Sequence, residues 1–252
     1  MGLIDYQTAL GRLIRANRLD SGGVGAAHRR WRDLALNNRE RILLESLQAG
    51  RGLHFTREVQ RSWCKGRARN TAYLTLSIMP EEQRQALLDA WVDSGGGVAS
   101  FSAGEAERLL DFIALRLPPR THALSLCRME QAVHRVNAAV ASGCVAESGT
   151  VGGMLCRAAA ASMVEFFAEP NLVLQAVQSN APLPTLCSSS VPIFFSPLLP
   201  GLFRRAEPDE AALWHRLELP ADAAALQSTC AGGNLAASVE TLLAQGIVAA
   251  HA

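Results

Sequence analysis

Cys127, Glu130 and His134 are the residues of this sequence whose types and spacing best suit chemistry. They lie at positions i, i+3 and i+7, so a helix through this segment would place all three on one face. A thiolate, a carboxylate and an imidazole could together ligate iron or zinc, or pair as nucleophile and base. The alternative is that Arg128, Glu130 and His134 form a buried polar network that fixes how the helix packs. Three groups on one helix cannot surround a metal, and no partner pair with ligand spacing occurs elsewhere, which favours the structural interpretation.

A second candidate is Cys64, which has three cationic neighbours between positions 61 and 67. Such neighbours can lower the pKa of a thiol and make it reactive. A lone cysteine beside Trp63, however, is more often a packed small hydrophobe. The sequence leaves open whether Cys64 or Cys127 takes part in chemistry.

The other familiar catalytic patterns are missing from the sequence. It contains no Gly-rich phosphate loop, no zinc-protease helix motif, no serine-hydrolase elbow and no paired carboxylates. The arginine groups at 12–18 and 29–32 are followed by Asp20 and Asp33, and such mixed charge is typical of solvated helix faces. We therefore predict no catalytic residue, metal or other cofactor in this chain.

Composition limits the class of protein. Of 252 residues, 49% are hydrophobic and 19% charged, enough apolar material for a sizeable core and too much for a disordered chain. The net charge of +1 argues against a general nucleic-acid binder. The charge is unevenly distributed, because residues 1–100 carry 15 basic and 10 acidic side chains whereas residues 151–252 carry 4 and 8.

No apolar run approaches the ~20 residues that a membrane span needs. The most apolar stretch, 191–203, is short and holds three prolines. The N-terminus has no signal-peptide core, and the six cysteines are far apart without a Cys-x-x-Cys pair. We expect a cytoplasmic protein with reduced thiols and no membrane partner.

Apolar spacing predicts helices over the first 145 residues. Gly50 and Gly52 should end one helix, and Thr56 could cap the next. Glycines 95–97 should stop a helix that starts after Pro80. Ser102 and Glu105 form a capping box, and a further helix should run from about Thr121 to Ala141.

Beyond Ser142 the pattern changes to short apolar runs. Glycines at 143, 149, 152 and 153 indicate a linker. Three strands are predicted, at Met163–Phe167, Leu172–Val177 and Val191–Phe195. Helices are expected at about Pro208–Leu217, at Ala221–Ser228 and from an Asn234 cap to Gly246, followed by a short strand at Ile247–Val248.

These elements predict an α+β protein of two domains. Residues 1–145 would form an all-helical domain, and residues 146–252 a small α+β domain with a winged-helix-like arrangement.

The second domain offers a place for an extended peptide. A small sheet with an exposed edge can accept a peptide as an extra strand, while a neighbouring helix supplies pockets for its side chains. The edge candidate is the run Val191, Pro192, Ile193, Phe194 and Phe195, and the helix candidate contributes Leu235, Val239, Leu242 and Leu243. The alternative is that both segments simply fill the core.

Two segments resemble a known family. The element Cys127, Arg128, Met129, Glu130 and Gln131, together with the run 201–214, is similar to the accessory subunits of multinuclear non-haem iron enzymes in ribosomal peptide natural-product biosynthesis. Those subunits act in methanobactin and thiaglutamate biosynthesis. The resemblance implies a heterodimer in which a TIM-barrel partner holds the iron and oxidises a peptide cysteine. This chain would bind the precursor peptide through a domain like the peptide-recognition elements of such pathways.

The resemblance also assigns expected roles. Val191–Phe195 and the helix 235–243 would bind the leader peptide. The Cys127–His134 segment would support the subunit interface or the core. Two other classes compete: a stand-alone enzyme that uses Cys127, Glu130 and His134, and a winged-helix DNA-binding protein. The latter conflicts with the acidic second half, since residues 231–246 contain no Lys or Arg.

Overall fold

The computed structural model describes residues 3–15, 31, 33–97, 103–143, 154–222 and 235–251. The chain divides into two units, the first comprising residues 1–70 and 81–100 and the second 71–80 and 101–252. The predicted domain boundary at residue 145 stays a prediction. Ser102, Asn234 and the linker glycines beyond residue 143 lie outside the described residues.

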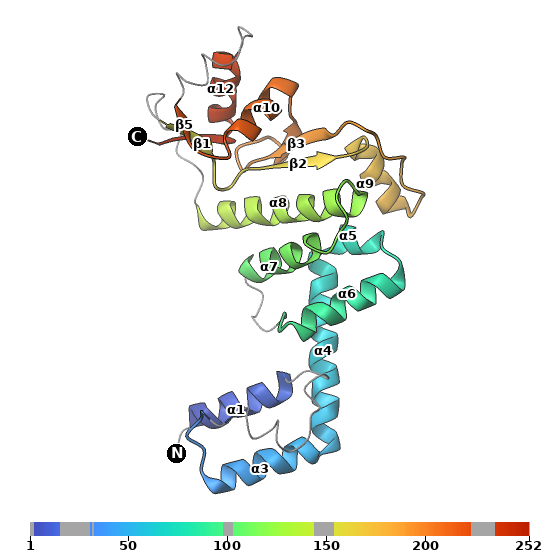
Figure 1. Ribbon diagram of the computed structural model, residues 1–252, viewed down its shortest axis with the longest axis vertical. Coiled ribbons are helices and arrows are strands. Elements are labelled where there is room, and N and C mark those ends of the chain that lie inside the picture. The colour runs from blue at the N-terminus through green and yellow to red at the C-terminus, as the bar shows by residue number, and fades with distance from the viewer. Residues whose placement is uncertain are drawn as a thin grey trace. The chain divides into compact units, whose positions relative to one another are not determined.

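The first unit is helical in its described part (Figure 1). Its helices are α1 (Leu3–Arg15), α3 (Asn38–Ala49), α4 (Arg51–Thr71, whose last residue belongs to the second unit) and α6 (Glu81–Asp93). Trp31, Leu13 and Leu44 form the centre of its core. Asn37 and Glu40 begin α3 with a reciprocal capping box, which satisfies two otherwise unpaired amides.

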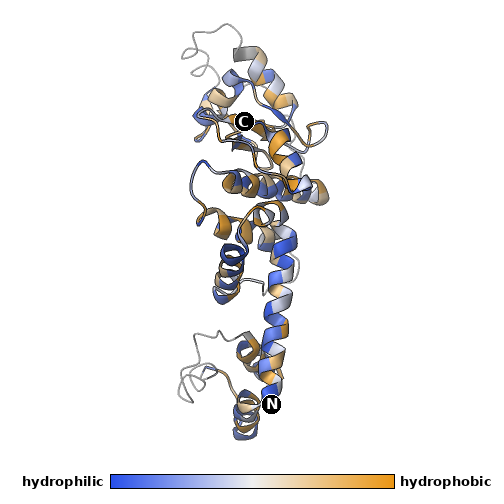
Figure 2. Cartoon of the chain, turned by 90° about the vertical axis from the view of Figure 1, so that its right-hand side faces the viewer, coloured by the Kyte–Doolittle hydropathy of each residue, from blue (hydrophilic) through white to orange (hydrophobic). Residues whose placement is uncertain are grey.

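The predicted cap at Thr56 is wrong. Helix α4 already begins at Arg51, directly after the Gly50 that ends α3, and Thr56 lies inside it with its Oγ1 donating to the Gly52 carbonyl at 3.0 Å. No proline interrupts residues 51–71, so the chain re-enters a helix at once. Figure 2 shows α4 mostly in hydrophilic colours, in keeping with its many basic side chains.

The second unit is α+β (Figure 1). Its helices are α5 (Tyr73–Ser77), α7 (Ala103–Ala114), α8 (His122–Ser142), α9 (Pro170–Ser179), α10 (Pro208–Arg216) and α12 (Leu235–Ala244). Its strands are β1 (Met154–Arg157), β2 (Ser162–Phe166), β3 (Val191–Phe195), β4 (Phe203–Arg205), β5 (Ala221–Asp222) and β6 (Val248–His251). They form two antiparallel sheets with orders β5-β1-β6 and β2-β3-β4. The predicted α+β class is confirmed.

Helix α8 matches its sequence prediction closely. Thr121 caps its first turn by accepting from the Leu124 amide, and Gly143 ends it in a left-handed conformation. The strands predicted at 163–167 and 191–195 also form, as β2 and β3. Within the described residues, no helix is long and apolar enough to cross a membrane.

Two predictions in the second unit are wrong. Leu172–Val177, expected as a strand, lies in helix α9, which begins with Pro170 in its first turn and ends at Asn180 in the left-handed region. Val173 and Ala176 are buried one helical turn apart, which fixes the helical period. The sequence predicts a helix at 221–228, but residues 221–222 form strand β5. Residues 223–228 lie outside the described part of the chain.

Strand β3 joins two hydrophobic clusters because alternate residues of a strand face opposite sides. Phe194 packs with Leu155, Trp214 and the apolar face of α12. Ile193 and Phe195 pack on the other side with Leu126 of α8 and with β2. Strand β3 is therefore packed on both faces over Ile193–Phe195.

A buried ion pair fastens α10 to β4. The Arg204 guanidinium binds the carboxylate of Glu210 through two hydrogen bonds of 2.6 and 2.7 Å, and Glu210 also accepts from the Glu207 amide. Glu210 is only 6% exposed. Burial raises the pKa of this carboxyl, but the hydrogen bonds from Arg204 outweigh it and hold the pKa below its ordinary value.

We predict that Arg204→Ala lowers the free energy of unfolding by about 3 kcal/mol, because it leaves the buried Glu210 carboxylate without its cation. Arg205→Ala is the matched control: Arg205 is 64% exposed and 3.6 Å from Glu169, so its loss should cost less than about 1 kcal/mol. Urea unfolding measures both. Equal losses in the two variants would contradict a structural role for the Arg204–Glu210 pair.

Candidate functional site

Helix α8 divides the Cys127–Gln131 element between two of its faces. Cys127 and Glu130 are buried toward α5 and α7, whereas Arg128 and Gln131 line a pocket beside β2. Residues 128, 131 and 135 follow the same i, i+3, i+7 spacing as 127, 130 and 134, displaced by one position. One helix thus carries two adjacent stripes with different surroundings.

Glu130 holds the start of α5. Its carboxylate accepts from the Leu74 amide at 2.6 Å, the Thr75 amide at 3.2 Å and the Thr75 hydroxyl at 2.6 Å. Burial raises the pKa of Glu130, while these hydrogen bonds oppose that rise. His134 lies one turn further along, with Nε2 3.4 Å from the Thr71 carbonyl. Glu130 and His134 therefore position a neighbouring segment, but Arg128 does not join them.

Cys127 is fully buried, and its thiol donates to the Leu110 carbonyl at 3.3 Å. Burial, with a smaller effect from the Glu130 carboxylate, raises the pKa of Cys127 to about 12. The thiol is accordingly protonated at neutral pH, which is unsuited to nucleophilic attack. Among the described residues, no three His, Cys, Asp or Glu side chains are grouped to hold a metal ion.

Cys64 is also buried, within the first unit. Its Sγ donates to the Gly97 carbonyl at 3.2 Å, and Arg67 donates to the same oxygen. Gly97 has φ +80°, and a Cβ there would lie 2.6 Å from the Cys64 Cβ. Cys64 thus fills a close contact between α4 and the turn after α6.

We predict that Cys127 resists alkylation by iodoacetamide in the native protein at mildly alkaline pH, because it is buried and its thiol stays protonated. The exposed Cys187 is the internal control and should be alkylated under the same conditions. Peptide mapping by mass spectrometry measures both sites. Native labelling of Cys127 as fast as that of Cys187 would contradict this prediction.

Val191–Phe195 does not form a sheet edge, contrary to the prediction. β3 is the central strand, paired with β2 along its length and with β4 over 193–195, and the Ala206 amide donates to the Pro192 carbonyl. Ile193, Phe194 and Phe195 are buried, and Val191 and Pro192 are half-buried. No main-chain group of β3 remains for an added strand.

The predicted residues of α12 also lie in the core. Val239, Leu242 and Leu243 are buried in the cluster around Phe194. Leu235 begins α12, and its side chain lies outside the described residues. Both segments therefore fill the core, the alternative that the sequence left open, and peptide contact by them stays a prediction.

The outer strand β2 provides the free edge that β3 lacks. Alternate residues of β3 direct their peptide groups toward β2, namely Val191, Ile193 and Phe195. Their partners on β2 therefore form hydrogen bonds to β3; these are Phe166, Val164 and Ser162. Because peptide groups alternate along a strand, Met163 and Glu165 direct theirs to the outer edge. Glu165 is already engaged, since its carbonyl accepts from the Ser125 hydroxyl at 2.7 Å. Met163 has no main-chain partner among the described residues.

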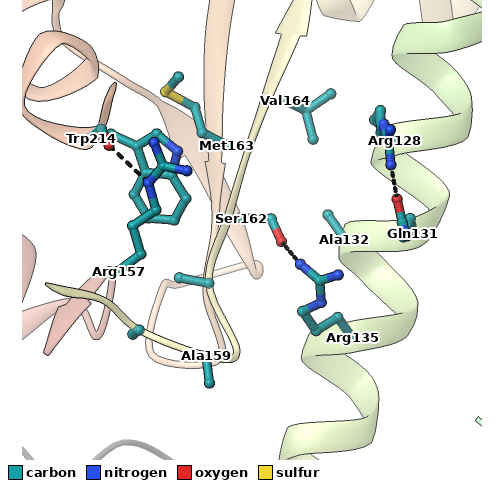
Figure 3. Close-up of a pocket in the computed structure, with 12 residues that line it drawn as sticks. Arg128, Gln131, Ala132, Arg135, Arg157, Ala159, Ser162, Met163, Val164 and Trp214 are labelled. Atoms are coloured by element: carbon teal, nitrogen blue, oxygen red, sulfur yellow. Dashed lines mark hydrogen bonds between the residues drawn. The ribbon is translucent and has the colours of Figure 1, made fainter. Parts of the chain in front are cut away.

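A pocket of about 430 Å³ opens at this edge, between α8, β2, the β1–β2 turn and α10 (Figure 3). It is lined by Arg128, Gln131, Ala132, Arg135, Arg157, Ala158, Ala159, Ala161, Ser162, Met163, Val164 and Trp214. Four of these residues are alanines, whose small side chains leave the space open. Three are arginines, and none is acidic.

The arginines are held by hydrogen bonds to the pocket wall (Figure 3). Arg135 donates to the Ser162 hydroxyl at 3.1 Å, and Arg157 donates through Nε to the Trp214 carbonyl at 2.9 Å. Arg157 also stacks on the Trp214 ring, 4.9 Å from its centroid. Arg128 donates to the Gln131 side chain at 2.7 Å. Their guanidinium groups are therefore placed before any ligand arrives.

Comparison with known proteins finds no family model that matches this chain and no curated protein with significant sequence similarity.

Proposed function

We propose that this chain is a non-catalytic accessory subunit that binds a ribosomal precursor peptide and presents it to an iron-dependent TIM-barrel enzyme. The enzyme would oxidise a peptide cysteine and hold the iron, so this chain would carry no cofactor of its own. The complex would work in the cytoplasm, without nucleic acid or membrane. Support comes from the resemblance of Cys127–Gln131 to such subunits and from the pocket that this same helix lines.

The observation that carries the proposal is the free main-chain edge of β2 beside the pocket. An extended peptide adds to a sheet through main-chain hydrogen bonds and gains selectivity from a neighbouring pocket. Met163 offers an N–H and a C=O that have no partner in the part of the chain that the structure describes, and it also lines the pocket. This edge replaces β3 as the proposed site of peptide addition.

A winged-helix-like arrangement of residues 146–252 belongs to the same proposal. Helices α10 and α12 pack together in the cluster that also includes Leu155 of β1 and Val248 of β6. Two helices against a small three-stranded sheet suit that arrangement.

The partner interaction is tested by co-expression with the non-haem iron enzyme encoded beside this chain. We predict a stable one-to-one complex in size-exclusion chromatography, with iron in the partner. Elution of this chain alone would contradict the proposal. Stoichiometric iron or zinc in the isolated chain, lost in His134→Ala, would favour the stand-alone enzyme instead.

Peptide addition at β2 is tested by Met163→Pro. Proline removes the outward N–H and leaves the β2–β3 bonds intact, although it also removes the Met163 side chain from the pocket, and its ring obstructs an added strand. We predict about fivefold or greater loss of affinity for the precursor peptide encoded with the enzyme, measured by fluorescence anisotropy.

Met163→Leu is the matched control, because it keeps the N–H and a similar side-chain volume, and it should bind as the unaltered protein does. Thermal unfolding checks that both variants fold. Equal peptide affinity in Met163→Pro and Met163→Leu would exclude strand addition at this edge.

A further inference from the structure

We infer that the pocket beside β2 binds a carboxylate of the peptide through the arginines that line it, Arg128, Arg135 and Arg157. The inference rests on the proposed function in taking the ligand to be a peptide. The carboxylate has two possible sources, an Asp or Glu side chain or the C-terminus of the peptide. Their chemistry at the pocket is the same.

The free edge of β2 is too short to bind a peptide by strand pairing alone. Beyond Met163 in one direction, the Glu165 and Phe167 carbonyls accept from the Ser125 hydroxyl and the Cys187 amide. In the other direction, the Ala161 amide donates a hydrogen bond to the Ala158 carbonyl within the β1–β2 turn. Met163 is therefore the residue of this edge that can pair through both its N–H and its C=O, which provides two hydrogen bonds worth about 1 kcal/mol each. Most of the affinity must come from the pocket.

The charge of the pocket selects an anion. Three arginines line it, and the carboxylates that accompany them lie outside its lining. Arg128 is 3.5 Å from Asp111, Arg135 is 3.0 Å from Glu107 and Arg157 is 3.8 Å from Glu218, and at least half of each carboxylate's side chain is exposed. Exposed ion pairs contribute little free energy, so a ligand carboxylate in the pocket can compete with these surface partners for the arginines.

The fixed guanidinium groups suit a carboxylate in particular. Each arginine has five N–H donors, and the bonds to Ser162, Trp214 and the surface carboxylates use only some of them. Figure 3 shows Arg135 extending from α8 to Ser162, whereas Arg157 lies on the other side of β2, beside Trp214. A planar carboxylate matches the fork of an arginine and gains charge-assisted hydrogen bonds that a neutral amide lacks.

The test uses three synthetic tripeptides with acetylated N-termini. The first is Val-Glu-Val amide, the second Val-Gln-Val amide, and the third Val-Gln-Val with a free C-terminal acid. Binding to the full chain is followed by NMR through the Met163 amide and the arginine Nε–H signals. We expect the first or the third peptide to bind about tenfold or more tightly than the neutral second peptide, which identifies the source of the carboxylate.

Variants connect this preference to the pocket. Arg135→Gln and Arg157→Gln should each remove most of the preference for the charged peptide, and Arg135→Lys should restore part of it. Arg205→Gln is the matched control, because this exposed arginine does not line the pocket. Equal affinity for all three peptides, no binding at millimolar concentration, or a preference unchanged in the Gln variants would overturn the inference.

These results are independent of the partner experiment. A complex with the iron enzyme, together with equal or absent tripeptide binding, would leave the proposed function standing and remove the carboxylate site. A carboxylate preference that depends on Arg135 and Arg157, without any such complex, would leave a peptide-binding pocket in a protein of another function.

Discussion

The burial of both faces of β3 is the constraint on which the rest of the second unit depends. Phe194 belongs to one hydrophobic cluster, and Ile193 and Phe195 belong to the other, so these three residues are packed on both faces of the strand. Its main chain is paired on both sides. A peptide strand can therefore add to this sheet only at an outer strand, and the pocket lined by α8 opens beside β2.

Helix α8 links the stability of this unit to its pocket. On one stripe, Glu130 secures α5 through three hydrogen bonds, and Cys127 packs against α7. On the adjacent stripe, Arg128 and Arg135 reach the pocket. Because the two stripes share a rigid helix, the packing that buries Glu130 also sets the direction in which the arginines point.

The sequence predicts much of the fold and less of the site. Thr121, Gly143 and the apolar period between them locate α8 to within a residue, because caps and helical periodicity are local signals. A short apolar run with β-branched and aromatic residues likewise locates β3. Residues 172–177 mislead because a short apolar run fits either period, and the Pro170 that begins the helix is the better guide.

The site depends on contacts that the sequence does not encode locally. Whether β3 is an edge or a centre is decided by β4, which pairs with it from a separate segment. Arg157 and Ser162 come to the pocket from the β1–β2 turn region, and no spacing rule connects them to α8. The i, i+3, i+7 spacing of Arg128, Gln131 and Arg135 could have indicated this face of the helix. The sequence instead suggests Cys127, Glu130 and His134, one position earlier, because their side chains are typical of catalytic and metal sites.

Pro192 has a consequence for how the second sheet assembles. Its carbonyl accepts from Ala206, so its nitrogen, which carries no hydrogen, is turned toward β4. If β4 slid by two residues toward the start of β3, that position would need to donate a hydrogen bond that proline cannot make. The missing proton thus disfavours a shift of β4 in that direction, because the shift would leave a carbonyl of β4 without its donor.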